Sequence, residues 1–321
     1  MKKMSSTFAI WGFLSIFTWA PVGMAADYPQ NPIRMIVAYA AGGGTDVLAR
    51  IFQSSFEKVL GQRVFIENIP AGSTKMATMA LMKAKPDGYT LMFQPGISWV
   101  GSYYSDVFDY KPWERAVAIG NVTSEPYCLP TVRAESPFKT WADLVKAGKE
   151  NPGKLTCGGT PAKGFMQAAA MSTAKAAGIE TRFVGFAGGS LSEIALLGGH
   201  IDYRMGTLSE SINMVRAGKT RALAISTAKR MEYLPDVPTF HELGIGGTVL
   251  ISRSVYGPPG LPSGLTNTIT KMVEKTTKEP EFIKLVQNLL HTVDYRTPEQ
   301  TQQLVNNFEK EYGPMMKEMF K

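Results

Sequence analysis

The sequence is poor in the residues that build metal centres and disulfide frameworks. It has two cysteines, Cys128 and Cys157, and three histidines among 321 residues. The cysteines stand far apart and no His-x-x-x-His pair occurs, so no metal-ligand spacing is present and no cofactor is expected. Both cysteines lie in apolar, strand-like segments, where a disulfide and two buried free thiols agree equally well with the sequence.

Clustered charge is also lacking. The net charge is +7, but the basic residues are scattered and never form a run of four. A nucleic-acid surface needs clustered Lys and Arg, so no nucleic-acid partner is expected. Without Lys2 and Lys3 of the first 25 residues the net charge becomes +5, a mild excess that is compatible with an anionic ligand.

Only one apolar run approaches membrane-spanning length, and it lies at the N-terminus. Lys2 and Lys3 precede the apolar stretch 8–22, and Gly23-Met24-Ala25 follows as a small-x-small cleavage site. This pattern is typical of a cleavable export signal at residues 1–25, and the run is too short for a comfortable membrane anchor. We therefore expect an exported mature chain.

Residues 33–50 are the most informative segment. An apolar run at 33–39 indicates a buried strand, the triplet 42–44 is all glycine, and Thr45 and Asp46 begin an amphipathic stretch. A tight turn at a helix N-terminus leaves backbone N–H groups free to bind an anion. Asp46 is expected to cap this helix, and it could also grip a donor group of the ligand.

Strands and helices alternate along most of the remaining chain, which predicts helices flanking mostly parallel sheets. Ligands in such folds bind beyond the carboxyl ends of the strands. Strands are expected at 33–39, 64–67, 89–93, 127–132, 155–157, 181–184, 201–205, 221–227 and 249–256. Helices are expected at 45–60, 74–84, 141–150, 165–177, 191–197, 210–217, 264–278, 280–290 and 298–319.

Motifs for catalysis are incomplete. The turn 42–46 lacks the third glycine of a dinucleotide fingerprint, because Val47 stands there. The segment Gly96-Ile97-Ser98-Trp99-Val100 lacks the last glycine of a nucleophile elbow, and no histidine is placed to serve Ser98. A secreted hydrolase using Ser98 or Ser73 remains an alternative, although the chain is not expected to be an enzyme.

Several stretches together form a recognisable pattern: 28–34, 41–50, 61–68, 86–91, 151–155, 197–202, 217–224, and 228–230 with 234–239. They resemble the TctC or Bug-type periplasmic receptors of tripartite tricarboxylate transporters. The resemblance covers essentially the whole mature chain. It implies a two-lobed clamshell that holds a carboxylate through backbone amides and bridging waters more than through arginine.

The chain departs from the family pattern at several crevice positions. Tyr39-Ala40 precedes the glycines, Gly206 stands where an Asp is common, and the loop 159–164 is unusual. Lys163 and Arg204 are unexpected charges near the crevice. They could point to solvent, or one could meet a second carboxylate of the ligand.

The resulting interpretation is an exported solute receptor that captures a small organic acid between two lobes. Residues 26–125 and 250–321 are expected to form lobe 1, and residues 126–249 lobe 2. The expected partners are the acid and the membrane subunits of a tripartite transporter, with the chain a monomer. A sensor subunit for a membrane kinase is a further alternative. The expected ligand-binding residues are Tyr39, Ala41, Gly42, Gly43, Gly44, Thr45, Asp46, Gly72, Ser73, Gly96, Ile97, Ser98, Gly159, Thr160, Ala187, Gly188, Thr207 and Ser209.

Overall fold

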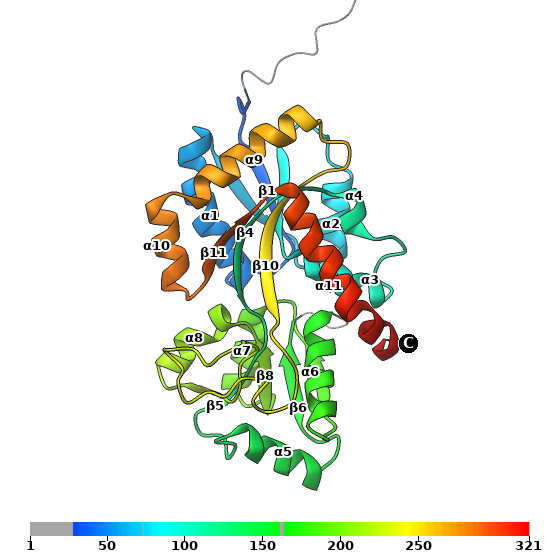
Figure 1. Cartoon of the computed structure of the whole chain (residues 1–321), viewed down its shortest axis with the longest axis vertical. Coiled ribbons are helices and arrows are strands. Elements are labelled where there is room, and N and C mark those ends of the chain that lie inside the picture. The colour runs from blue at the N-terminus through cyan, green and yellow to red at the C-terminus, as the bar shows by residue number, and fades with distance from the viewer. Residues whose placement is uncertain (1–27, 73, 161–163, 321) are drawn as a thin grey trace, which may run out of the picture.

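The computed structural model describes residues 28–72, 74–160 and 164–320. These residues form two lobes, each with its own β-sheet and flanking helices (Figure 1). The two-lobed α/β architecture predicted from the sequence is confirmed. The expected export signal, Ser73 and Lys163 lie outside the described residues.

Lobe 1 is built on a six-stranded sheet with the strand order β11-β4-β10-β3-β1-β2. Strand β1 pairs in parallel with β2 and β3, whereas β10 and β11 join as antiparallel strands. The apolar β1 is almost wholly buried, as its sequence predicts. The strands are β1 (Ile33–Val37), β2 (Val64–Asn68), β3 (Thr90–Gln94), β4 (Val117–Pro126), β10 (Leu250–Gly257) and β11 (Thr292–Arg296).

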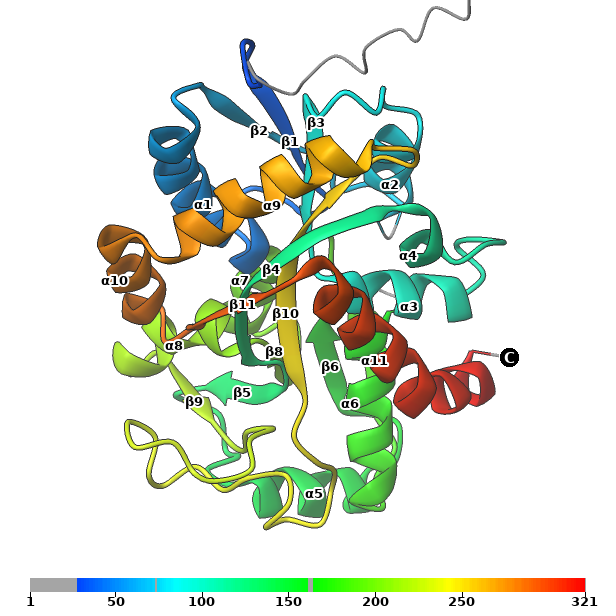
Figure 2. The same ribbon diagram turned by 45° about the horizontal axis from the view of Figure 1, so that its top comes forward.

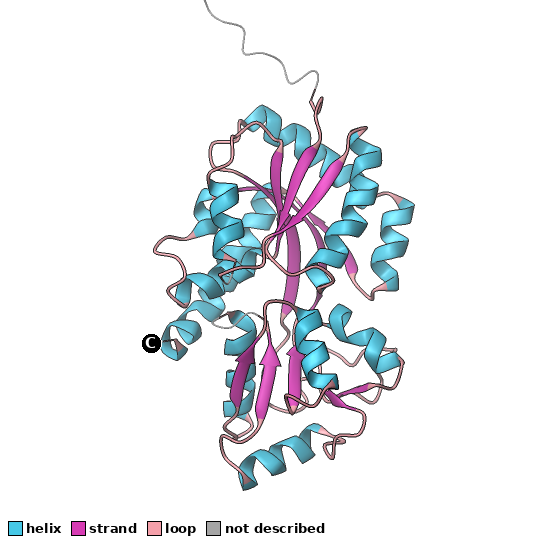
Figure 3. Cartoon of the chain, turned by 180° about the vertical axis from the view of Figure 1, so that it is seen from behind, coloured by secondary structure: helices cyan, strands magenta, loops and turns pink. Residues whose placement is uncertain are grey.

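Helices cover both faces of this sheet (Figure 3). Helix α1 is followed by Gly61, which has a φ of 68°. A residue with a side chain would be strained in this conformation, so glycine is suited to end the helix. Helix α11 begins with a Thr297–Gln300 capping box. The helices are α1 (Gly44–Leu60), α2 (Lys75–Met82), α3 (Gly96–Tyr104), α4 (Pro112–Arg115), α9 (Ser263–Thr277), α10 (Pro280–Asn288) and α11 (Pro298–Met319).

Lobe 2 holds a five-stranded sheet with the order β7-β6-β8-β5-β9. Strand β6 runs parallel to both of its neighbours, and β5 runs antiparallel to β8 and β9. The strands are β5 (Leu129–Arg133), β6 (Thr156–Gly159), β7 (Arg182–Gly185), β8 (Tyr203–Gly206) and β9 (Thr220–Ala222). The helices are α5 (Trp141–Glu150), α6 (Phe165–Ala176), α7 (Gly189–Leu197) and α8 (Leu208–Arg216).

Two long antiparallel strands, β4 and β10, run from lobe 1 towards lobe 2 (Figures 1 and 2). Their pairing reaches Leu250 opposite Pro126, and Tyr127 N then donates to Val249 O at 2.9 Å. Register shifts interrupt the pairing on either side of Ser254 and Val255. The lobes are therefore joined by a pair of strands whose regular pairing is interrupted a few residues before the junction.

The structure corrects the sequence prediction in three places. No helix was predicted after the strand 89–93, but α3 begins at Gly96 and buries Trp99. Helix α8 begins at Leu208, two residues before the predicted helix 210–217. Strand β4 was not predicted, because four of the five residues 121–125 in this buried strand are polar, so that it lacks an apolar pattern.

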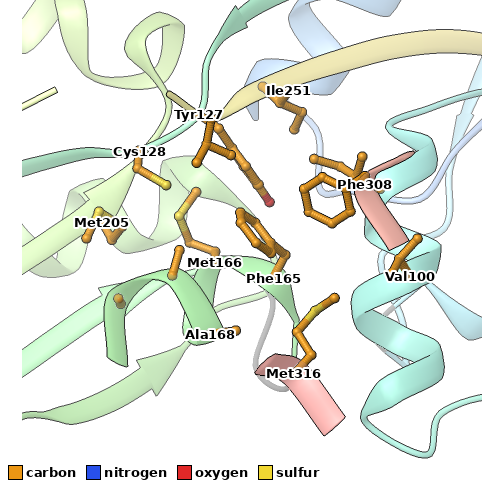
Figure 4. Packing of buried hydrophobic residues seen from close by; sticks show 14 of the residues in the cluster. Val100, Tyr127, Cys128, Phe165, Met166, Ala168, Met205, Ile251, Phe308 and Met316 are labelled. Carbon is orange, nitrogen blue, oxygen red and sulfur yellow. The ribbon is translucent and has the colours of Figure 1, made fainter. Parts of the chain in front are cut away.

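An apolar cluster joins the lobes on one side of the junction. It includes Val100 of α3, Phe308 of α11 and Phe165 of α6, whose ring lies 4.6 Å from that of Phe308 (Figure 4). Tyr127 stacks on Phe165 with 5.5 Å between ring centroids. Cys128 and Cys157 belong to the same cluster as buried free thiols, so the disulfide that the sequence left open is not formed.

Glycines stand where the lobes touch. A β-carbon on Gly101 of α3 would lie 2.6 Å from the backbone nitrogen of Phe165, and one on Gly188 would lie 2.9 Å from Cβ of Ala40. A β-carbon on Gly44 would lie 3.0 Å from Glu210 Cγ and 3.1 Å from Ser209 Oγ.

None of the described helices is long and apolar enough to cross a membrane.

Gly101→Ala is expected to keep the lobes apart, because its new methyl group would overlap backbone of the other lobe. The matched variant is Gly264→Ala in the first turn of α9, where the methyl group meets open space. Alanine normally stabilises a helix by about 1 kcal/mol over glycine. Gly264→Ala should therefore raise the melting temperature, whereas Gly101→Ala should lower it and increase the radius of gyration in small-angle scattering. An equal gain in both variants, with an unchanged radius, would contradict this role of Gly101.

A candidate anion site between the lobes

The lobes enclose a cavity of about 20 Å³, which has room for roughly one water molecule. Both lobes and the connecting strands contribute to its wall. The lining residues are Tyr39, Gly43, Gly44, Thr45, Tyr127, Thr160, Met166, Gly189, Thr207, Glu210, Ile251 and Arg253. The structure is thus a closed form, and a ligand larger than water requires the lobes to part.

Asp46 fixes the glycine turn on the lobe 1 side. Its carboxylate accepts the Gly42 N–H at 2.9 Å, Arg50 Nε at 3.0 Å and Asn68 Nδ2 at 2.8 Å. Burial opposes ionisation, but these donors outweigh it and hold the pKa of Asp46 below its ordinary value. All three bonds are made to residues of lobe 1. Asp46 therefore stabilises the conformation of the glycine turn.

The first turn of α1 presents unpaired donors. Gly42 N–H is taken by Asp46 and Gly43 N–H by Ala40 O. Among the described residues, no hydrogen-bond partner is found for the N–H groups of Gly44, Thr45 and Asp46. These three groups and the helix dipole favour an anion at this end of α1.

Arg253 of β10 adds a buried cation beside that turn. Its side chain is 1% exposed, and Nη1 lies 2.7 Å from Glu125 Oε1. Its Nε donates to Thr45 Oγ1 at 3.2 Å, and Nη2 lies 3.4 Å from the position of a β-carbon on Gly44. Within the described part of the chain Nη2 has no hydrogen-bond partner, so it is free for a ligand next to the α1 amides.

Glu125 of β4 balances Arg253 and closes the N-terminus of α8. It accepts Ser209 N at 2.8 Å and Ser209 Oγ at 3.0 Å, while His291 Nε2 lies 3.3 Å away. Burial alone would raise the pKa of Glu125, but the charge of Arg253 and the Ser209 N–H lower it below the ordinary value. The carboxylate is thus held by both lobes.

The lobe 2 wall carries a second buried ion-pair network. Arg204 is 1% exposed and pairs with Glu193 and Glu210. Glu210 also accepts Thr207 N and forms a capping box with that residue. Of the two alternatives for Arg204, the one in which it points to solvent is wrong, and both of its charged partners are glutamates of lobe 2.

Apolar and hydroxyl groups complete the cavity. Tyr39 Oη lies 2.6 Å from Ser98 Oγ, and burial raises the pKa of Tyr39 to about 12. Tyr127, Met166 and Ile251 also line the cavity, and Figure 4 shows them in the apolar cluster between the lobes. This mixture offers an apolar surface beside the polar groups, as small-molecule sites do.

The structure places the sequence-predicted residues unevenly. Tyr39, Gly43, Gly44, Thr45, Thr160 and Thr207 line the cavity. Ser98 and Ser209 bond to Tyr39 and Glu125, while Gly188 and Gly159 pack close by against Ala40 and against Phe183 with Met166. Ala41, Gly42, Gly72 and Ala187 are exposed at loop surfaces. Gly96 and Ile97 line a different hollow of about 190 Å³ beside Tyr256 and Val305.

Sequence reasoning missed the charged residues at the centre of the site. The position of Arg253 could have been found from the sequence. It lies two residues from both Ile251 and Val255, so a predicted apolar strand places all three side chains on one face. Glu125 had none, since β4 itself was not predicted. Glu210 was read only as part of a helix.

Ser98 and His291 are each paired with another side chain among the described residues. The hydroxyl of Ser98 pairs with Tyr39, and His291 lies beside Glu125. In the described ranges no three His, Cys, Asp or Glu side chains gather to hold a metal ion. The amides of α1 and the Arg253 guanidinium are groups that can recognise an anion.

His291 is expected to make the fold sensitive to mild acid. Burial lowers the pKa of His291 to about 4, although the negative charge of Glu125 acts to raise it. Between pH 6.5 and 4 the unfolded chain binds this proton and the folded chain does not, so stability falls as pH falls, by roughly 3 kcal/mol at most. Urea unfolding between pH 7 and 5 should show a shallower loss for His291→Gln than for the exposed control His241→Gln. Equal slopes in both variants would contradict this assignment.

Comparison with known proteins places the chain among solute receptors. The family model of the tripartite tricarboxylate transporter family receptor, TctC, matches residues 48–320. A Cupriavidus necator protein described as "UPF0065 protein in gbd 5'region" is 31% identical over 266 residues, covering 82% of this chain and 80% of its own.

Solved structures agree in fold. Periplasmic binding protein BugD is 26% identical, with a TM-score of 0.81 over 90% of this chain and 98% of its own. MatC from Rhodopseudomonas palustris, solved with bound malate, is 23% identical, with a TM-score of 0.84 over 90% of this chain and 100% of its own. Because the family match spans most of the chain and the clamshell agrees with it, the resemblance found in the sequence is confirmed, and the chain belongs to the TctC family of tripartite tricarboxylate transporter receptors.

Proposed function

We propose that this chain is a periplasmic, non-enzymatic receptor that closes around a small organic acid and delivers it to the membrane subunits of a tripartite tricarboxylate transporter. Residues 1–25 would direct export and be removed. Residues 26–125 with 250–321 would form one lobe and residues 126–249 the other. The receptor would work as a monomer, since each chain carries both walls of its own cleft.

One observation carries the proposal. Gly44, Thr45 and Arg253 line the same interlobe cavity, and among the described residues the amides of the first two and Nη2 of Arg253 have no hydrogen-bond partner. A carboxylate there would accept charge-assisted hydrogen bonds from both sources. MatC supports the choice of ligand class, because this protein of similar fold was solved with bound malate.

Closure follows from the position of these donors. The amides belong to lobe 1, Arg253 to a connecting strand, and Thr207 and Glu210 to lobe 2. A bound acid would contact all three only when the lobes meet, so it would favour the closed form by its extra affinity for it. The connecting segments near 124–128 and 248–252 are the proposed hinge.

The alternatives predict different behaviour. A hydrolase would need Ser98 as a nucleophile, yet Ser98 is hydrogen-bonded to Tyr39. A sensor subunit would bind the same acids and differ only in its membrane partner, which co-purification with crosslinking would identify.

Gly44→Val is expected to weaken binding of carboxylates. A β-carbon at Gly44 would already lie 3.0 Å from Glu210 Cγ and 3.1 Å from Ser209 Oγ, so a branched side chain would prevent closure. Isothermal calorimetry with mono- and dicarboxylates of two to six carbons should show the affinity reduced by about tenfold or more, which corresponds to 1.4 kcal/mol.

The matched control is Gly247→Val, where the new side chain meets open space. This variant should bind as the native chain does. If no carboxylate binds the native chain, or if Gly44→Val binds as tightly as the control, the proposed site is wrong.

A further inference from the structure

The walls of the interlobe cavity differ in charge. On the lobe 1 side, Arg253 and the first-turn amides of α1 present donors. On the lobe 2 side, Glu210 lines the cavity together with Gly189 and Thr207. A bound ligand therefore meets donors on one wall and the Glu210 side chain on the other.

Glu210 covers the N-terminus of α7, which would otherwise be a second anion site. A β-carbon on Gly189, the first residue of α7, would lie 2.1 Å from Glu210 Oε1 and 2.6 Å from Oε2. The carboxylate thus rests directly against this helix start. A second carboxylate placed there would stand beside Glu210 and be repelled.

No positive charge on this wall is left for a second carboxylate among the described residues. Arg204 bonds to Ser192, Ser211 and Glu210, and it pairs with Glu193 as well. The N-terminus of α8 is satisfied too, because Glu210 accepts Thr207 N and Glu125 accepts Ser209 N. One cation is therefore shared by two carboxylates, of which only Glu210 lines the cavity.

Glu210 still has accepting capacity. Its Oε2 takes the bonds from Arg204 and Thr207, whereas Oε1 has no hydrogen-bond partner among the described residues. A hydroxyl, amide or ammonium group could donate to Oε1, and a carboxylate could not. A buried acceptor left without its donor would lower the affinity of ligands that lack one.

We propose that Glu210 selects acids whose second polar group is a hydrogen-bond donor, so that the receptor prefers hydroxy or amino monocarboxylates to dicarboxylates. This inference rests on the proposed function, because it assumes that the first carboxylate binds at Gly44 and Arg253. The donor group differs from one ligand of this class to another, but the acceptor is Glu210 in each case.

Calorimetry with four-carbon acids that differ only at the far end tests the inference directly. The set is butyrate, succinate, 4-hydroxybutyrate and 4-aminobutyrate, with the three- and five-carbon counterparts run alongside. The native chain should bind the best donor-bearing acid at least about tenfold more tightly than the dicarboxylate of equal length. Glu210→Gln should reduce this ratio to near one, because the amide both donates and accepts.

Glu193→Gln is the matched control. Glu193 pairs with the same Arg204 but does not line the cavity, so this variant should keep the native ratio. If the dicarboxylate binds the native chain as tightly as its donor-bearing counterpart, the inference about Glu210 is overturned while the receptor function stands. The inference about Glu210 is likewise overturned if Glu210→Gln and Glu193→Gln change the affinity ratio equally. If none of the acids binds, the proposed function itself fails. Should Glu210→Gln not fold, the native ratio alone decides.

Discussion

The buried ion pair between Arg253 and Glu125 connects the whole site. The two residues stand on the antiparallel strands that run between the lobes, and each reaches a different helix: Arg253 bonds to Thr45 of α1, and Glu125 to Ser209 of α8. Removing one partner of such a pair leaves an uncompensated charge and costs roughly 3–5 kcal/mol. The pair therefore links the connecting strands to the glycine turn through Thr45 and to the lobe 2 wall through Ser209.

Around this pair three helix N-termini converge, and they differ in how their donors are used. Helix α8 is closed by Glu125, Glu210 and Thr207. Helix α7 is covered by the Glu210 carboxylate. At helix α1, Gly44 and Thr45 line the cavity beside Arg253, and no partner is found for their amides among the described residues. The protein's own carboxylates thus occupy two of the three places where an anion could bind, which leaves a directional site with a donor end and an acceptor end.

The sequence predicted the scaffold better than the site. Strand β1, the glycine turn and α1 follow from an apolar run, three glycines and an amphipathic stretch, and these are local signals. Gly44, Thr45 and Thr207 were found because they stand where strands end. Glu125, Glu210 and Arg253 were missed because their meaning is tertiary: a charge inside a strand or at the third position of a helix looks like ordinary surface until the partner element is known. Gly96 and Ile97 were assigned to the cleft because a glycine after a strand suggests a loop, whereas Tyr256 and Val305 pack against Gly96 and direct it elsewhere.

The most direct test is a crystal structure of the receptor with an acid that calorimetry shows to bind. The account predicts that one carboxylate of the ligand lies within hydrogen-bond distance of the Gly44 and Thr45 amides and of Arg253, with the lobes closed over it. A carboxylate found instead at the start of α7, or outside the space between the lobes, would contradict the account.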